Sequence, residues 1–256
     1  MDQILVPLVL VVGLAALGLA LALRTARPAW IAAAAVVVVT TVAGRLLGHS
    51  ALALVLGTLA EIAALGLVAA DAEPEARAAL RLWTLALVPA ILMTGLAWGL
   101  TDLGHARPAA PWDRVAVGLF VLGFALKLAL LPLIFWLPAV ARAASATSLM
   151  LIVGIVDAGV AADLLALSAT APWIFADHVA LWAVPAVASL VGGALLAAGA
   201  RDLKTILAFT GVADSGLLLI GLLAPDAVAH TGVAVGLAGL ALAAAALFGA
   251  VACGEA

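Results

Sequence analysis

The chain has 256 residues, of which 68% are hydrophobic and 10% are charged, and its formal net charge is −3. Soluble globular domains carry about 25% charged residues, so this composition excludes an ordinary soluble domain. The sequence contains no polybasic segment, so it gives no support to nucleic-acid binding. Cys253 is the single cysteine, which excludes a disulfide within the chain and any multi-cysteine metal site.

Long apolar runs, separated by short charged or proline-containing segments, predict an all-α polytopic membrane protein. A spanning helix needs about 20 mostly apolar residues, and it satisfies its backbone hydrogen bonds internally because lipid offers no partners. We expect about nine transmembrane helices in a single membrane domain, residues 1–256, in contact with the lipid bilayer. The predicted helices cover residues 4–23, 29–47, 51–70, 80–101, 114–138, 145–166, 179–199, 205–223 and 229–252.

Basic residues are unevenly divided between the two sets of interhelical loops. Three follow the second, fourth, sixth and eighth helices, namely Arg45, Arg107 and Arg114. Seven follow the first, third, fifth and seventh helices, namely Arg24, Arg27, Arg77, Arg81, Arg142, Arg201 and Lys204. Cytoplasmic loops of membrane proteins are enriched in Lys and Arg. We therefore expect a multi-pass protein of the bacterial inner (plasma) membrane, with the N-terminus outside and the C-terminus in the cytoplasm.

Four charged residues lie well inside the apolar runs rather than near the ends of the predicted helices. Glu61 and Lys127 each lie in the middle of a predicted helix, and Asp157 and Asp214 lie within two later ones. A charged side chain at the bilayer centre costs at least about 2.5–3.5 kcal/mol. We therefore expect the four to face one another or water. The alternative is that each is an isolated polar residue packed within the bundle.

Two prolines follow Lys127 in the same predicted helix. Pro132 comes five residues later, and Trp136 and Pro138 come after it. Proline removes a backbone donor and breaks or kinks a helix, and unwound backbone at membrane depth is tolerated where it lines a cavity. Lysine suits such a site because its protonation is readily changed by burial and by neighbouring charges. A nearby Glu61 would hold Lys127 protonated, and separating the pair would release the proton.

Three stretches carry a family resemblance. Gly123–Lys127 (GFALK) precedes Pro132 and the WLP run at 136–138, Glu61 lies two helices earlier, and Arg201–Thr210 reads RDLKTILAFT. Between about residues 50 and 223, these features resemble the antiporter-like, proton-translocating membrane subunits of respiratory complex I. The same family serves multisubunit Na⁺/H⁺ antiporters, membrane-bound hydrogenases and inorganic-carbon uptake complexes.

The resemblance implies roles for particular residues. The helix that carries Lys127 would be the family's broken helix, here broken at Pro132. Asp202 and Lys204 would form a structural motif, in which Lys204 caps a helix start at the cytoplasmic face. Asp157 lies in the helix in which relatives carry a Lys or His, and Asp214 occupies a position where relatives often carry His or Gln. The residues that we assign to proton or ion translocation are Glu61, Lys127, Asp157 and Asp214.

The resemblance also implies a truncated architecture. Relatives contain two inverted five-helix repeats, each with a broken helix. In this chain, one five-helix repeat is complete, from helix 29–47 to helix 145–166, and only the opening of the second is present. The second repeat's own lysine-bearing broken helix is missing.

Three functions are open at this stage. The chain is either a half-channel subunit that conducts protons or another cation within a larger complex, a structural subunit that anchors or docks a catalytic partner, or a stand-alone secondary transporter. The first two imply other membrane subunits as partners, in a complex such as an NADH:quinone oxidoreductase-like or hydrogenase-like translocase. We expect no cofactor, no metal site and no catalytic chemistry of its own, because the sequence has no phosphate-binding loop, no Cys or His cluster and no suitably spaced nucleophile–base pair.

Overall fold

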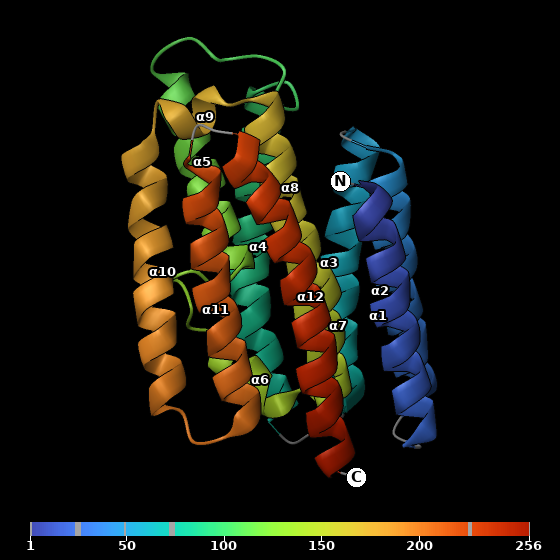
Figure 1. The fold of residues 1–256 in the computed structure, drawn as a ribbon. Helices are drawn as coiled ribbons and strands as arrows, with labels where there is room; N and C mark the ends of the chain where they lie inside the picture. The colour runs from blue at the N-terminus through green and yellow to red at the C-terminus, as the bar shows by residue number, and fades with distance from the viewer. Residues whose placement is uncertain (1, 24–26, 49, 72–74, 225–226, 256) are drawn as a thin grey trace.

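The protein is an up-and-down bundle of helices in a computed structural model, which describes residues 2–23, 27–48, 50–71, 75–224 and 227–255 (Figure 1). In chain order the elements are α1 (Asp2–Ala22), α2 (Pro28–Leu46), α3 (Ala51–Asp71), α4 (Ala76–Leu100), α5 (Trp112–Lys127), α6 (Leu137–Ala143), α7 (Ala146–Leu151), η1 (Ile152–Asp157), α8 (Ala158–Thr170), α9 (Trp173–Ala176), α10 (Val179–Gly199), α11 (Leu203–Leu222) and α12 (Ala227–Glu255). Neighbouring long helices alternate in direction, as short connections require.

The predicted class, an all-α polytopic membrane protein, is confirmed. Within the described ranges, seven helical segments are long and apolar enough to cross a membrane, and Val9–Ala22 is a shorter apolar helix. The predicted helix 114–138 differs most, because it is divided into α5 and α6. Arg24, which was counted for the orientation, lies outside the described residues.

The bundle has two ends, which are named here for their short helices. The α9 end carries α9 and the connection 101–111, and the α6 end carries α6 and the connection 200–202 (Figure 1). Helices α2, α4 and α11 run toward the α9 end, whereas α3, α5 and α10 run away from it. Any residue can therefore be placed by its distance along a helix from one of these two ends.

One span lies at the centre of the bundle. Ala146–Thr170 comprises α7, η1 and α8, and 78% of the residues in its 18-residue apolar stretch are buried, compared with 22–50% in the corresponding stretches of the other six spans. Its neighbours include α1, α2, α3 and α12. The outer helices instead present large apolar side chains to the surroundings, including Leu14, Leu92 and Leu195, each 68% exposed. Lipid accommodates such a surface. Each outer helix can therefore be apolar both on the side that packs in the bundle and on the side that faces outward.

Glycines bring α10 and α11 into backbone contact. A Cβ atom added at Gly193 would lie 2.8 Å from the amide nitrogen of Ala213, and one added at Gly216 would lie 2.5 Å from that of Leu190. Small residues of this kind allow close helix packing in membranes, where no hydrophobic effect drives helices together. Gly192, beside Gly193, instead faces the side chain of Leu131 in the segment between α5 and α6.

Replacing Gly216 with alanine is expected to destabilise the bundle. The new Cβ would meet two backbone atoms of α10, at Leu190 and Ala186, and backbone cannot move aside as a flexible side chain can. Overpacking of this kind costs about 1–3 kcal/mol. The measurement is the thermal unfolding midpoint of the purified protein in detergent, where Gly216→Ala should lower the midpoint.

Gly239→Ala on α12 is the matched control. A Cβ there meets nothing within 4 Å, and alanine favours a helix interior by up to about 1 kcal/mol over glycine. Its midpoint should stay unchanged or rise. Equal midpoints for the two variants would show that the α10–α11 approach is looser than described.

Candidate functional site

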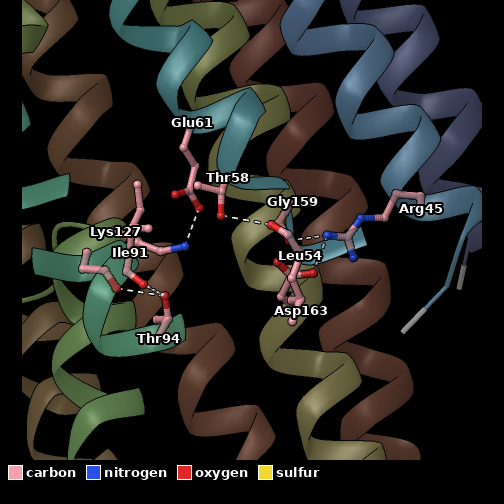
Figure 2. Close-up of polar contacts among 10 residues, drawn as sticks. Arg45, Leu54, Thr58, Glu61, Ile91, Thr94, Lys127, Gly159 and Asp163 are labelled. Atoms are coloured by element: carbon pink, nitrogen blue, oxygen red, sulfur yellow. Dashed lines mark hydrogen bonds and ion pairs between the residues drawn. The ribbon is translucent and has the colours of Figure 1, made fainter. Parts of the chain in front are cut away.

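Glu61 and Lys127 form an ion pair in the middle of the membrane-spanning region. The Lys127 Nζ donates to Glu61 Oε1 over 2.7 Å, and the two side chains are 10% and 6% exposed (Figure 2). Glu61 is the central residue of the 21-residue α3, so it lies about 15 Å from either helix end at 1.5 Å per residue. An isolated charge at this depth is costly, and each member of the pair compensates the other.

The pair borders a cavity of about 460 Å³. Besides Glu61 and Lys127, its lining includes Thr58, Thr94 and Asp163. One water needs roughly 10–15 Å³, so this cavity accommodates many. The second carboxylate oxygen of Glu61, Oε2, is buried and has no hydrogen-bond partner among the described residues.

The cavity extends toward the α9 end of the bundle. Its lining continues to Ala51 at the start of α3, to Gly99 near the end of α4, and to Leu103 in the connection that follows. On the other side of Glu61, α3 buries the apolar residues Ala64 and Leu67 completely. The ion pair therefore borders a mostly apolar cavity toward one end of the bundle and a packed apolar region toward the other.

Lys127 is the last residue of α5, and its predicted place in mid-helix is wrong. Leu130 N donates to Ala125 O over 2.8 Å, across Ala129, which has a φ of +50°. This is a Schellman-type helix end, formed with alanine in the left-handed position where glycine is usual. The negative end of the α5 dipole therefore faces the Lys127 ammonium and stabilises its charge.

The helix is interrupted from Leu128 to Trp136. The interruption begins four residues before Pro132, not at Pro132 itself. Pro132 lies within the interruption, and Pro138 occupies the first turn of α6, where proline costs no hydrogen bond. The Trp136 indole Nε1 donates to Leu126 O over 2.9 Å, a carbonyl that the end of α5 leaves without a helical partner. The predicted break is therefore present, but the Schellman turn ends α5 before the proline is reached.

Two further contacts hold the interrupted segment in place. Leu131 N donates to Ser189 Oγ of α10 over 2.9 Å. The Trp136 ring also stacks on Trp83 of α4, with centroids 5.3 Å apart and planes 6° apart. Unwound backbone at membrane depth needs such protein partners, because lipid provides none.

Asp157 lies on the central span, at the last position of the π-helical turn η1. π-Turns are rare and are frequent at functional sites. The carboxyl groups of Asp157 and Glu61 are close enough to interact electrostatically. Asp157 is therefore near the ion pair, although it does not line the cavity of about 460 Å³.

Asp214 is not brought to the pair. It is half-buried on α11, a helix that packs mainly against α10 and α12. Among the described residues, no hydrogen bond or ion pair joins Asp214 to Glu61 or Lys127, and it does not line the cavity beside them. Of the four predicted ion-translocating residues, Glu61 and Lys127 are therefore in direct contact and Asp157 is within electrostatic range of Glu61, whereas Asp214 shows neither relation.

Asp202 and Lys204 lie at the α6 end of the bundle. Asp202 is the N-cap of α11, and its carboxylate accepts from Thr205 N over 2.8 Å. Partial burial favours a higher pKa for the Asp202 carboxyl, but the hydrogen bonds from Thr205 outweigh it and lower the pKa below its usual value. Lys204 Nζ donates to Ala144 O over 3.1 Å, at the end of α6. Lys204 therefore caps a helix end, whereas the sequence interpretation had it capping a helix start.

Sequence reasoning missed a second ion pair beside the first. Arg45, in the last turn of α2, is paired through its Nη2 with Asp163 Oδ1 of α8, and the same nitrogen donates to Gly159 O over 3.1 Å (Figure 2). Arg45 was counted only as a loop charge, and Asp163 was not selected. A signal was present: both residues lie a few positions from the end of a predicted helix, and both of those ends lie on the same side of the membrane.

More than half of the chain matches a known protein family. Residues 109–254 match the family described as NADH:quinone oxidoreductase/Mrp antiporter, transmembrane. A relative named NADH-quinone oxidoreductase subunit N 2, from Solidesulfovibrio magneticus, is 33% identical over 150 residues, which are 58% of this chain and 32% of the relative. A protein of the same name from Opitutus terrae is 32% identical over 118 residues, 46% of this chain and 25% of the relative. The chain thus spans a third or less of these relatives.

Solved structures share the fold over nearly the whole chain. A chain of the Mrp complex from Dietzia sp. DQ12-45-1b superposes with a TM-score of 0.85 at 19% identity, covering 96% of this chain and 49% of the other. A chain of respiratory complex I from Thermus thermophilus with bound aureothin superposes with a TM-score of 0.77 at 23% identity, covering 98% and 57%. At these identities the likeness is one of fold.

Replacing Trp136 with phenylalanine is expected to loosen the interruption. The ring stack on Trp83 can persist, but the buried Leu126 carbonyl loses its donor. An unsatisfied buried polar group costs about 1–3 kcal/mol, so the thermal unfolding midpoint should fall. Trp83→Phe is the control, because it alters the same stack and leaves the bond to Leu126 in place. If both variants lower the midpoint equally, the indole hydrogen bond is not what anchors the end of α5.

Proposed function

Because the chain belongs to the NADH:quinone oxidoreductase/Mrp antiporter transmembrane family, we propose that it is a cation-translocating subunit of a larger complex I-like membrane complex. In this proposal the translocated ion is a proton, and the Glu61–Lys127 pair carries it. The observation on which the proposal rests is the pair itself, buried in the middle of the spanning region and bordering a cavity that accommodates water. Other membrane subunits of the complex are the expected partners.

The proposed cycle consists of three proton transfers, which together move one proton. When Lys127 moves away from Glu61, the carboxylate is left without a counter-charge and takes a proton from water in the cavity. The separated ammonium is equally unfavourable at this depth, and it gives its proton to the next acceptor, for which we propose the Asp157 carboxylate. Asp157 must have passed on the proton of the previous cycle before it can accept this one. On return, the neutral Lys127 amine takes the proton from Glu61, and the ion pair forms again. One proton has then passed from the cavity toward the central span.

The cavity gives this transfer a direction. It extends toward the α9 end, and the uneven distribution of Lys and Arg assigns that end to the outside and the α6 end to the cytoplasm. We therefore propose a bacterial inner-membrane protein with its N-terminus outside, in which Glu61 exchanges protons with the outer side. The residues on the cytoplasmic side of Glu61, such as Leu67, are apolar and packed. In this proposal the site is therefore a half-channel, which neighbouring subunits complete.

A structural, non-conducting subunit is the second candidate. The observation in its favour is the position of Asp214, which does not line the cavity beside the pair. A polar path from Glu61 through Asp157 would then stop at the central span. On this alternative the ion pair stabilises the bundle, and proton transfer by the complex does not depend on its titration.

Lys127→Ala separates the two candidates. The complex is isolated through a tag on this chain, reconstituted in vesicles, and energised by NADH or by an imposed Na⁺ gradient, whichever drives the wild type. Proton transfer is followed by quenching of a pH-sensitive dye. The conducting role predicts that Lys127→Ala reduces transfer to the level of vesicles without the complex, because Glu61 then has no proton donor or acceptor beside it.

Two further variants control for folding. Removing one member of a buried pair costs about 3–5 kcal/mol, whereas replacing both by neutral groups of similar size is often tolerated. Glu61→Gln with Lys127→Met should therefore assemble and still not conduct. Leu122→Ala changes an exposed residue of the same helix and should conduct normally. Wild-type proton transfer by the assembled Lys127→Ala complex would overturn the conducting role and leave the structural one.

A further inference from the structure

The Arg45–Asp163 pair belongs to the same charged site as Glu61 and Lys127. Its side chains are 13% and 24% exposed, and both residues lie within membrane-spanning helices. Asp163 is seven residues before the end of α8, so it lies about 10 Å from the α9 end at 1.5 Å per residue. The second pair is therefore on the same side of Glu61 as the cavity.

Two cavities connect the pairs. The larger one, of about 460 Å³, is bordered by Glu61, Lys127 and Asp163. A narrow one of about 20 Å³, enough for one water, is bordered by Glu61, Arg45 and Asp163. Both carboxylates thus border both cavities, while each cation borders one. Arg45 Nε, like Glu61 Oε2, is buried and has no hydrogen-bond partner among the described residues.

A glycine keeps the space between the pairs open. Gly57 lies one helical turn before Glu61 on α3, and it lines both cavities. A Cβ atom at Gly57 would lie 3.9 Å from Asp163 Oδ2, so the backbone of α3 passes close to this carboxylate. In Figure 2 the Thr58 side chain lies between the two pairs in this view, and its hydroxyl donates to Leu54 O rather than to either carboxylate.

Lys127 therefore shares its cavity with two carboxylates. Its ammonium is bound to Glu61, while Asp163 is held by Arg45. Without Arg45, two carboxylates would compete for one ammonium, and a net negative charge would remain in the membrane interior. Such a charge is costly, so one carboxyl would take up a proton. Asp163 is also close enough to Glu61 for the two carboxylates to repel each other.

We propose that Arg45 is a positioning residue for the translocating pair: by neutralising Asp163, it leaves Glu61 as the only counter-ion of Lys127. This inference rests on the proposed function and adds a role that the ion pair alone does not require. Arg45 acts on translocation only through which carboxylate holds Lys127.

A charge-balance cycle tests the inference in the reconstituted complex. Arg45→Leu should lower proton transfer by about tenfold, the scale on which directly coupled residues affect one another. Arg45→Leu with Asp163→Asn removes both charges and should restore transfer to within about twofold of the wild type. Arg45→Lys, which keeps the charge, should retain most of the activity. All rates are normalised to the amount of assembled complex.

Infrared spectroscopy distinguishes positioning from a merely structural role. In assembled Arg45→Leu, the carbonyl stretch of a protonated carboxylic acid should appear, because two carboxylates then face one ammonium. The band should disappear in the Arg45→Leu/Asp163→Asn variant, and adding Glu61→Gln to Arg45→Leu should also weaken it. A structural ion pair that acts on stability alone would produce no such band in the protein that assembles.

The controls separate this inference from the proposed function. Arg107→Leu removes an exposed ion pair with Asp177 at 2.6 Å and a second one with Asp113 at 3.3 Å. It should change neither readout, because exposed pairs contribute little. If Lys127→Ala abolishes transfer while Arg45→Leu transfers normally and shows no new band, the positioning role is overturned and the proposed function stands. A band that Glu61→Gln leaves unchanged would also overturn it. Normal transfer by Lys127→Ala would overturn both.

Discussion

The Glu61–Lys127 ion pair is the interaction on which the rest of the arrangement depends. Either charge alone would be costly in the bilayer interior, and the 2.7 Å contact brings both into balance. The contact requires the end of α5 to lie beside the middle of α3. Because α5 ends at Lys127, this residue lies at the negative end of the helix dipole, where a positive charge is favourable.

Ending a helix in the membrane interior leaves carbonyls that lipid cannot satisfy. Here the protein satisfies them from within the same segment: Leu130 returns an amide to Ala125 O, and the Trp136 indole reaches Leu126 O. The ring that supplies the second bond is fixed by its stack on Trp83. The position of Lys127 is thus coupled, through its own helix end, to α4 and to the first turn of α6.

Much of the fold was predictable, because the constraint that sets it is simple. Apolar runs of spanning length report membrane helices directly, and charges within such runs must find partners, which is why Glu61 and Lys127 could be selected together. The end of α5 was less accessible. Sequence reasoning assigns a break to Pro132, but the helix ends earlier through a left-handed residue, Ala129, whose side chain gives no sign of that conformation.

The misplaced and missed residues have physical explanations of the same kind. Arg45 lies so near a helix end that its charge was attributed to the loop, although a long arginine side chain reaches back into the bundle to Asp163. Asp214 was grouped with the pair because it interrupts an apolar run. Depth along a helix is readable from sequence, but the direction in which a side chain faces around the helix depends on packing, and α11 directs this residue elsewhere.

The two ion pairs together bear two positive and two negative charges, all within the interior of the helical bundle. In such surroundings a change at one member is opposed by the others, because any net charge must be offset by proton uptake, by hydration or by movement of a counter-ion. The element that connects this group to the remainder of the bundle is the central span, which carries both Asp157 and Asp163 on either side of its change from π to α geometry. A displacement of that span would alter the distances from both carboxylates to Glu61 at once. Its central packing against α1, α2, α3 and α12 therefore makes it the element through which motion elsewhere in the membrane would reach the ion pairs.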